Sequence, residues 1–179
     1  MSDLDWVHLR LGDVATQGAH VTRWTPRNED ALFLSPRTKL EKGTPIRGGI
    51  PVVFPWFGED SERRGPSHGF ARRVPWTVLS SGAARTNGDE AVLLELCDNE
   101  ATCVLTDPVL RRTLTVLKEG ARSTVVWTPG AARAAALPDL GDSWPQFLCV
   151  ESGNVMEDAI TLQPGERHVM RVRIECAAG

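Results

Sequence analysis

Hydrophobic and polar residues alternate with a period of two near both ends of the chain. In residues 6–11 every second side chain is valine or leucine, and in residues 168–174 methionine, valine and isoleucine alternate with arginine. This period is typical of strands with one buried face. Similar patterns predict further short strands at residues 13–24 (with a break near Gly18), 31–34, 75–79, 91–96, 102–105, 109–116, 123–127, 146–151 and 159–162.

A single short helix is predicted, in the alanine-rich residues 131–137. Many short strands separated by glycine and proline favour an all-β sandwich, and no linker or internal repeat interrupts the pattern. A chain of 179 residues with 41% hydrophobic residues suits one domain spanning residues 1–179.

The net charge of −3 disfavours a nucleic-acid partner. The sequence has no apolar run of membrane length and no signal-like start, so we expect a cytoplasmic protein without a membrane partner. Its four cysteines lack the CxxC spacing of zinc or redox sites, so we expect reduced thiols.

The stretch from residue 45 to residue 76 concentrates the candidate chemistry. Arg47 precedes two glycines, which let a backbone approach a ligand closely, and a guanidinium group suits a phosphate or carboxylate. In an extended segment, His68 and Arg72 would point to the same face. These residues together predict a site for an anionic polar ligand, although a solvated arginine and a structural histidine are the simpler interpretations.

Other parts of the stretch leave alternatives open. Residues 50–57 could form a buried strand or the aromatic wall of a pocket. Residues 59–65 are predicted to be a solvated loop without chemistry. Outside the stretch, His8 and His20 are interpreted as ordinary strand histidines.

The order of motifs along the chain resembles that of the hexose-6-phosphate mutarotases, a glucose-6-phosphate 1-epimerase branch of the aldose 1-epimerase superfamily. The central motifs are RGGIP, VVFPWFG, SHGFAR and VPW. They are preceded by GAHVTRW and LFLSP, and followed by STVVWTPG, FLCVE and LQPGE. The resemblance implies a galactose-mutarotase-like β-sandwich that interconverts the α and β anomers of a hexose 6-phosphate, with no metal or other cofactor.

The resemblance also implies a role for each site residue. Glu151, in the CVE motif, would be the base that takes the proton from the C1 hydroxyl, while an acid protonates the ring oxygen. Arg47 and Arg72 would hold the phosphate, and Ser67 would contact the ligand. His68 would hydrogen-bond sugar oxygens and could assist the acid.

The chain departs from the family pattern in its centre. The family's second histidine, in a Leu-His-Thr-Tyr-Phe motif, has no counterpart: the four histidines are at 8, 20, 68 and 168, and there is no tyrosine. We infer an internal deletion near residues 116–118 that removes a block of central strands. Relatives suggest a monomer, but exposed strand edges would permit association.

Three functions follow from these observations. The first is a hexose-6-phosphate 1-epimerase, and the second is a non-catalytic sugar-phosphate-binding remnant of that family, which the missing histidine favours. The third is a structural β-domain with a tryptophan-rich surface, which the retained motifs disfavour. A metal-dependent cupin is a weaker alternative because no His-x-His pair lies near a carboxylate.

Overall fold

The computed structural model describes residues 2–60, 62, 64–77, 85–86, 89–90 and 102–179. The chain divides into two units, which are described separately. The first unit comprises residues 1–83 and 129–147, and the second comprises residues 84–128 and 148–179. Regular structure in the described residues is mostly β, with one short α-helix and a few 3₁₀ turns. The all-β class is therefore confirmed.

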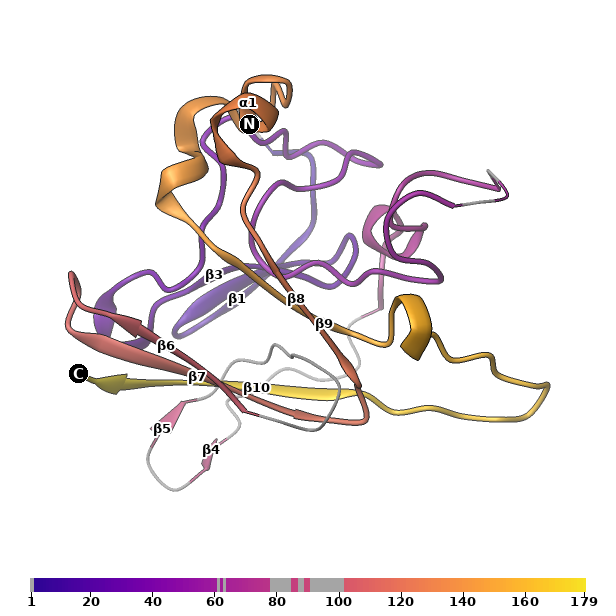
Figure 1. Ribbon diagram of the computed structural model, residues 1–179. Helices are drawn as coiled ribbons and strands as arrows, with labels where there is room; N and C mark the ends of the chain where they lie inside the picture. Colours follow the sequence, from indigo (N-terminus) through magenta and orange to yellow (C-terminus); the bar gives the residue numbers. More distant parts are fainter. Residues whose placement is uncertain (1, 61, 63, 78–84, 87–88, 91–101) are drawn as a thin grey trace. The chain divides into compact units, whose positions relative to one another are not determined.

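The sheet of the first unit is an antiparallel meander of three strands, drawn in indigo and violet in Figure 1. These are β1 (Trp6–Leu9), β2 (Gly12–Ala15) and β3 (His20–Trp24). The predicted strand at residues 6–11 is confirmed for residues 6–9, with a turn at 10–11, and the predicted break near Gly18 is confirmed. A register shift between Asp13 and Val14 marks a bulge opposite β3.

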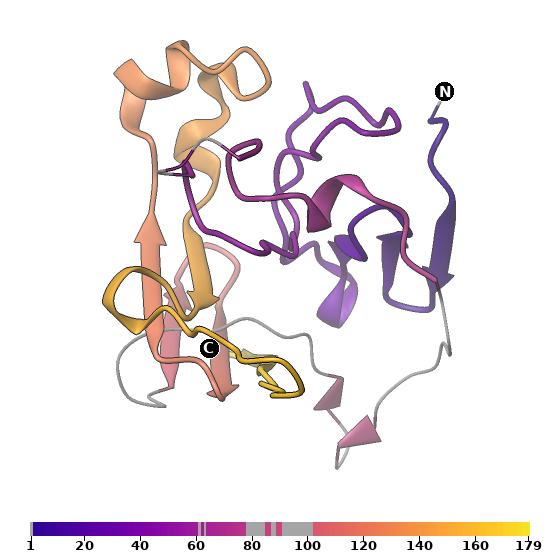
Figure 2. The same ribbon diagram turned by 90° about the vertical axis from the view of Figure 1, so that its right-hand side faces the viewer.

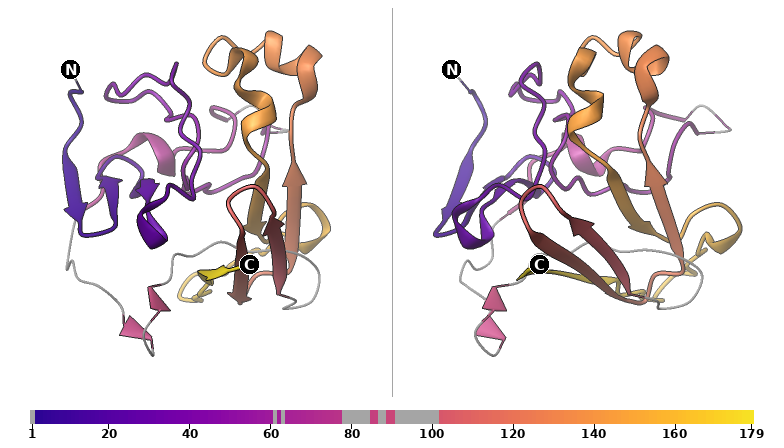
Figure 3. Two further views of the ribbon diagram at one scale, coloured as in Figure 1. Left: turned by 90° about the vertical axis from the view of Figure 1, so that its left-hand side faces the viewer. Right: turned by 60° about the vertical axis from the view of Figure 1, so that its left-hand side comes forward.

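Loops with few regular elements make up most of the first unit beyond its sheet (Figure 3). They contain the 3₁₀ turns η1 (Pro26–Asn28), η2 (Ala71–Arg73) and η3 (Gly141–Gln146), and the helix α1 (Gly130–Ala135). The helix confirms the prediction for residues 131–137. Buried apolar side chains hold these loops to the sheet: Leu4, Ala15 and Ile46 form one cluster, against which Trp6, Leu34 and Leu40 pack.

The second unit contains a three-stranded antiparallel sheet in the order β10-β7-β6. Its strands are β6 (Cys103–Asp107), β7 (Arg112–Glu119) and β10 (Arg171–Ala178). Buried β-branched residues stabilise the sheet, as in the pair Val116 and Ile174, which are opposite each other and both 4% exposed. The predicted strand at 168–174 is therefore present but shifted toward the C-terminus.

Two further strand pairs lie in the described part of the second unit. Strands β8 (Ser123–Trp127) and β9 (Cys149–Gly153) form an antiparallel ribbon in which every residue of one strand pairs with a residue of the other. Figure 2 shows them as neighbouring orange arrows that point in opposite directions. Strands β4 (Arg85–Thr86) and β5 (Asp89–Glu90) form a short hairpin. A 3₁₀ turn, η4 (Met156–Asp158), follows β9.

The inferred deletion point lies within a regular strand. Residues 112–119 form β7 without a break, and Val116 pairs with Cys103 of β6 on one side and Ile174 of β10 on the other. The chain on both sides of the junction therefore continues in one ladder of hydrogen bonds. Whether relatives carry a block of strands at this point stays a prediction.

Two predicted strands are wrong. Residues 31–34 form only an isolated bridge, between Leu34 and Gly48. Pairing cannot continue there because Gly48 and Gly49 both have positive φ, which bends the opposing segment. Residues 159–162 have no regular secondary structure and pair in none of the described ladders.

Other predictions are resolved in part. Residues 50–57 are no strand: they contain bridges at Ile50 and Phe54 only, and Phe54 is 64% exposed. Pro75 forms a bridge with Gln17, but residues 78–79 and 91–96 lie outside the described residues. Cys103, Cys149 and Cys176 form no disulfide. No helix in the described part of the chain is long and apolar enough to cross a membrane.

Candidate functional site

The loop that contains Arg47 is fixed by its glycines. Gly48 has a φ of 100°, and a Cβ on it would lie 2.3 Å from the carbonyl oxygen of Phe33. A side chain at this position would therefore collide with backbone, which explains the glycine. The amide of Gly49 donates to the same Phe33 carbonyl at 2.7 Å, and the amide of Ile50 donates to Val21 at 2.8 Å. The loop is thereby held to β3 and to residues 33–35.

Arg47 itself is held by a carboxylate far along the chain. Its Nε and Nη2 donate to the two carboxylate oxygens of Asp139, at 2.9 and 3.2 Å. Asp139 is in turn fixed by Ser35, whose hydroxyl donates to its backbone carbonyl at 2.5 Å. The Arg47 amide donates to the Thr38 hydroxyl at 2.7 Å. A bidentate pair of this kind fixes the plane of the guanidinium group.

His68 is held in one tautomer by its neighbour. Its Nδ1 accepts the amide proton of Gly58 at 3.1 Å, so the ring proton of the neutral form lies on Nε2. Its own amide donates to the Gly58 carbonyl at 2.7 Å, and its ring packs edge-on against Phe57. These contacts hold both the backbone and the ring of His68, whose φ is positive at 64°.

Both predicted arginines, Arg47 and Arg72, lower the pKa of His68. Burial lowers the pKa of His68, and the positive charges of Arg72 and then Arg47 lower it further. Arg72 Nη2 donates to the carbonyl of Ser67 at 2.7 Å. Within the first unit, the structure therefore brings Arg47, Ser67, His68 and Arg72 into one neighbourhood.

Glu151, the predicted base, lies in the second unit. It is a half-buried residue at the centre of β9, opposite Val125 of β8. The ribbon is regular on both sides of it, so its backbone position is well defined. Its role toward the residues of the first unit stays a prediction.

One prediction near the site is wrong in part. Residues 59–65 contain a loop, but Asp60 is buried rather than solvated. Its carboxylate accepts from the backbone amides of Glu62 and Arg64 and from the Arg64 guanidinium. The hydrogen bond from the Arg64 side chain is the main cause that lowers the pKa of Asp60 to about 2. Arg64 also lies over the ring of Trp56, so this loop is held by charge and by stacking.

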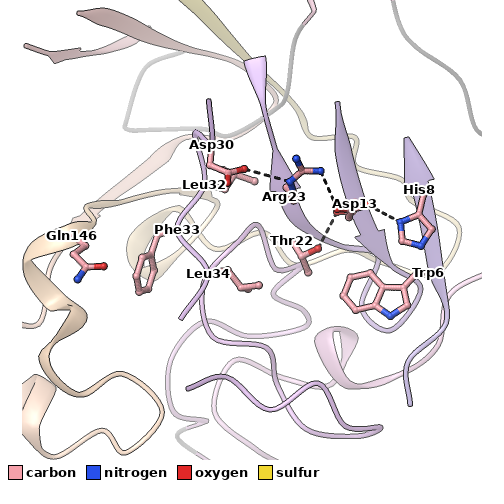
Figure 4. Close-up of a pocket in the computed structure, with 10 residues that line it drawn as sticks. All are labelled: Trp6, His8, Asp13, Thr22, Arg23, Asp30, Leu32, Phe33, Leu34 and Gln146. Atoms are coloured by element: carbon pink, nitrogen blue, oxygen red, sulfur yellow. Dashed lines mark hydrogen bonds and ion pairs between the residues drawn. The ribbon is translucent and has the colours of Figure 1, made fainter. Parts of the chain in front are cut away.

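A separate hollow of about 520 Å³ opens on the first unit (Figure 4). Its polar side is a chain of contacts: Asp13 is hydrogen-bonded to His8 at 2.6 Å and forms an ion pair with Arg23 at 3.5 Å, and Arg23 also contacts Asp30 at 3.6 Å. Trp6 lies beside His8, with the two rings stacked. The lining residues are Trp6, His8, Asp13, Thr22, Arg23, Asp30, Leu32, Phe33, Leu34 and Gln146, and none of them is a predicted site residue.

Two residues of the site escaped sequence reasoning. Asp139 lies 92 positions from Arg47, and no local motif links the two. The sequence predicts an ordinary strand histidine at position 20, and His20 does lie in β3, but its Nε2 contacts the carbonyl oxygen of Gly48 at 2.7 Å. Its place in the GAHVTRW motif was the available signal. In the described residues, no three histidine, cysteine or acidic side chains are grouped as a metal site.

Comparison with solved structures confirms the galactose-mutarotase-like fold. The provisionally named mutarotase YeaD from Salmonella typhimurium matches with a TM-score of 0.70 and 20% identity, over 98% of this chain and 94% of that one. HI1317 matches with a TM-score of 0.69 and 19% identity, over 98% and 93%. At these identities the likeness concerns the fold alone.

Relatives in sequence carry the provisional name glucose-6-phosphate 1-epimerase. The protein from Salmonella typhimurium is 43% identical over 109 residues, which cover 57% of this chain but only 36% of the relative. The protein from Escherichia coli is 49% identical over 67 residues, or 23% of its length. The protein from Cenchrus ciliaris is 39% identical over 282 positions, which cover 97% of this chain and 85% of the relative.

The model of the aldose 1-epimerase family matches residues 10–101 and 83–175, which together span most of the chain. The two matches contain the glycine loop, the His68 segment and the β8–β9 ribbon. The chain belongs to the aldose 1-epimerase family.

Proposed function

We propose that this chain binds a hexose 6-phosphate and interconverts its α and β anomers, as a glucose-6-phosphate 1-epimerase does. The observation that carries the proposal is the neighbourhood of Arg47, His68 and Arg72, in which both guanidinium groups are close enough to act on one imidazole. Two such cations suit a phosphate, because a guanidinium donates several hydrogen bonds in one plane. The provisional names of the relatives support the same substrate.

The reaction needs one base and one acid, and no covalent intermediate. Glu151 would take the proton from the C1 hydroxyl as the bond between C1 and the ring oxygen breaks, and the ring oxygen would gain a proton. The open aldehyde rotates about C1–C2 and closes on its other face by the reverse steps. His68, with its proton on Nε2, can donate a hydrogen bond to a sugar oxygen.

The alternative is a sugar-phosphate-binding remnant without turnover, and one observation favours it. Each of the other three histidines already contacts a partner: His8 contacts Asp13, His20 contacts the Gly48 carbonyl, and His168 contacts the Gly120 carbonyl. A replacement for the family's second histidine would have to leave such a contact. We therefore expect binding to be better preserved than turnover.

The inferred deletion supports this alternative. The alignment with the Cenchrus ciliaris relative extends over 282 positions, more than the 179 residues of this chain, so gaps must interrupt the chain. We propose that residues 1–179 are one shortened domain of the family. Its second unit exposes apolar side chains that a missing block of strands would cover, including Val104 at 59% and Val126 at 57%.

The test is two-dimensional exchange NMR of the anomers of glucose 6-phosphate, with the spontaneous rate in buffer subtracted. The epimerase proposal requires a rate that is proportional to protein and is lost in Glu151→Gln but kept in the control Glu157→Gln, an exposed glutamate of the same unit. Arg47→Ala should weaken ligand binding at least tenfold, and the control Lys39→Ala should not. Binding without exchange would select the remnant, and no loss of binding in Arg47→Ala would reject both.

A further inference from the structure

The segment Gly18–His20 lies between the two loops that contain the arginines. On one side, the amide of Gly18 donates to the carbonyl of Val74 at 2.8 Å, and a Cβ on Gly18 would lie 2.8 Å from the Cα of Arg72. On the other side, His20 Nε2 contacts the carbonyl oxygen of Gly48 at 2.7 Å. Three consecutive residues therefore contact both arginine loops.

The contact to Gly48 has a defined direction. A carbonyl oxygen can only accept, so the proton of the imidazole lies on Nε2 and His20 is the donor. Its Nδ1 is buried and has no hydrogen-bond partner among the described residues. A second ring proton would place a charge in a site that is 1% exposed and close to Arg72. His20 is thus held as a neutral donor.

Arg47 contacts Thr38 and Asp139, and the Ile50 amide donates to Val21 of β3; the remaining backbone bonds of the loop go to residues 33–35. The Arg47 carbonyl accepts from the Ser35 amide at 3.0 Å, and the Gly49 amide donates to Phe33 at 2.7 Å. Both of these partners lie in residues 33–35, whereas His20 comes from β3. The Cβ position of Gly49 is 2.8 Å from His20 Nε2, so the imidazole also packs against the loop.

We propose that His20 is a positioning residue that, together with Gly18, sets the spacing between the Arg47 and Arg72 guanidinium groups and so determines affinity for the phosphate of the ligand. The inference rests on the proposed binding of a sugar phosphate. His20 does not touch the ligand. It fixes the carbonyl of Gly48 next to Arg47, while Gly18 donates to Val74 and lies against the backbone of Arg72.

The decisive comparison uses two substitutions of similar volume. In His20→Gln the amide can still donate to the Gly48 carbonyl, and in His20→Met no donor remains. We expect His20→Gln to bind glucose 6-phosphate within about twofold of the original chain and His20→Met at least fivefold more weakly. At saturation, the ³¹P shift of the bound phosphate should move toward that of Arg47→Ala only in His20→Met. A purely structural role would lower the folded fraction and leave that shift unchanged.

A measurement without ligand separates this inference from the proposed function. Hydrogen exchange of the Gly49 amide and of Arg47 Nε–H should be at least tenfold faster in His20→Met and unchanged in His20→Gln. Equal exchange in the two variants would overturn the inference. Loss of protection in a folded His20→Gln would also overturn it, and this result can be obtained even if His20→Met does not fold. If the original chain fails to bind glucose 6-phosphate, the proposed function fails, and the exchange data still decide whether His20 orders Arg47.

Discussion

Acidification should destabilise the first unit through His20, by an amount that the structure fixes. Burial is the largest cause that lowers the pKa of this histidine from 6.5 to about 4, and the nearby Arg72 adds to the effect. The unfolded chain therefore binds a proton near pH 6.5, whereas the folded chain resists it until about pH 4. The stability contribution is complete above pH 6.5 and is lost as the pH falls toward 4.

The magnitude follows from proton linkage. With those two pKa values, lowering the pH from about 7.5 to about 5 reduces the unfolding free energy by about 2 kcal/mol. His68 acts in the same direction because its pKa is also lowered. The original chain alone would therefore not isolate His20, and the quantity to measure is its difference from His20→Gln, in which His68 is kept.

Urea unfolding followed by tryptophan fluorescence is a suitable assay. Five of the six tryptophans belong to the first unit, and Trp24 is only 3% exposed, so unfolding should change the emission strongly. We expect the stability difference between the original chain and His20→Gln to shrink by about 2 kcal/mol between pH 7.5 and pH 5. A difference that does not depend on pH would refute the reasoning, because it would mean that the proton affinity of His20 is the same in both states.

Three further predictions concern the glycine loop, the Asp60 loop and the central strand. Gly48→Ala places a Cβ 2.3 Å from the Phe33 carbonyl oxygen at a residue with positive φ, so it should lower the unfolding free energy by about 2 kcal/mol or more. Urea titration measures this change, and an unchanged stability would show that the loop relaxes. Asp60→Asn should remove the stabilisation that appears above pH 3.8 and is lost as the pH falls toward 2, so the unfolding free energies of the variant and the original chain should converge at low pH. Urea titrations followed by circular dichroism would record this, with the exposed Glu62→Gln as control. Val116→Ala should lower the unfolding free energy by about 1.5 to 3 kcal/mol because Val116 is 4% exposed and lies between two neighbouring strands. Amide hydrogen exchange should become faster in β6, β7 and β10 but not in β1–β3.

Strands could be predicted from the sequence where their own residues favour extended structure. The strand predicted at residues 123–127 is β8 with the same bounds, and its threonine and valines favour a strand although its partner β9 lies beyond α1 and η3 in the chain. The prediction for residues 31–34 failed for a reason that lies elsewhere in the chain. The opposing segment contains Gly48 and Gly49 at positive φ, so only one bridge forms. An apolar run shows that a segment is buried, but its partner decides whether it becomes a strand.

In the candidate site, too, local motifs could be predicted from the sequence, whereas contacts between distant residues could not. Arg47, His68 and Arg72 could be selected from the sequence because their motifs are local, and the motif order identified the family. The bond between Arg47 and Asp139 could not be predicted, since it joins residues 92 positions apart and Asp139 has no distinctive neighbours. His20 was placed in the correct strand, but the direction of its Nε2 depends on where the Gly48 loop passes.

In the first unit, the groups that can bind an anion are arginines, whereas the histidines that could deliver a proton have lowered pKa values. Arg72 lowers the pKa of both His20 and His68, and burial acts in the same direction on each. Both imidazoles are therefore neutral near pH 7, so in the neighbourhood of His68 the positive charge for a phosphate comes from Arg47 and Arg72 rather than from a histidine. A neutral His68 whose Nδ1 accepts from Gly58 can donate a hydrogen bond, but it holds no spare proton for a ring oxygen. Retained binding with weak turnover is thus the expected consequence of this arrangement. Because the pKa of His68 is lowered, any exchange rate that depends on protonated His68 should rise only in solutions more acidic than the usual titration range of histidine.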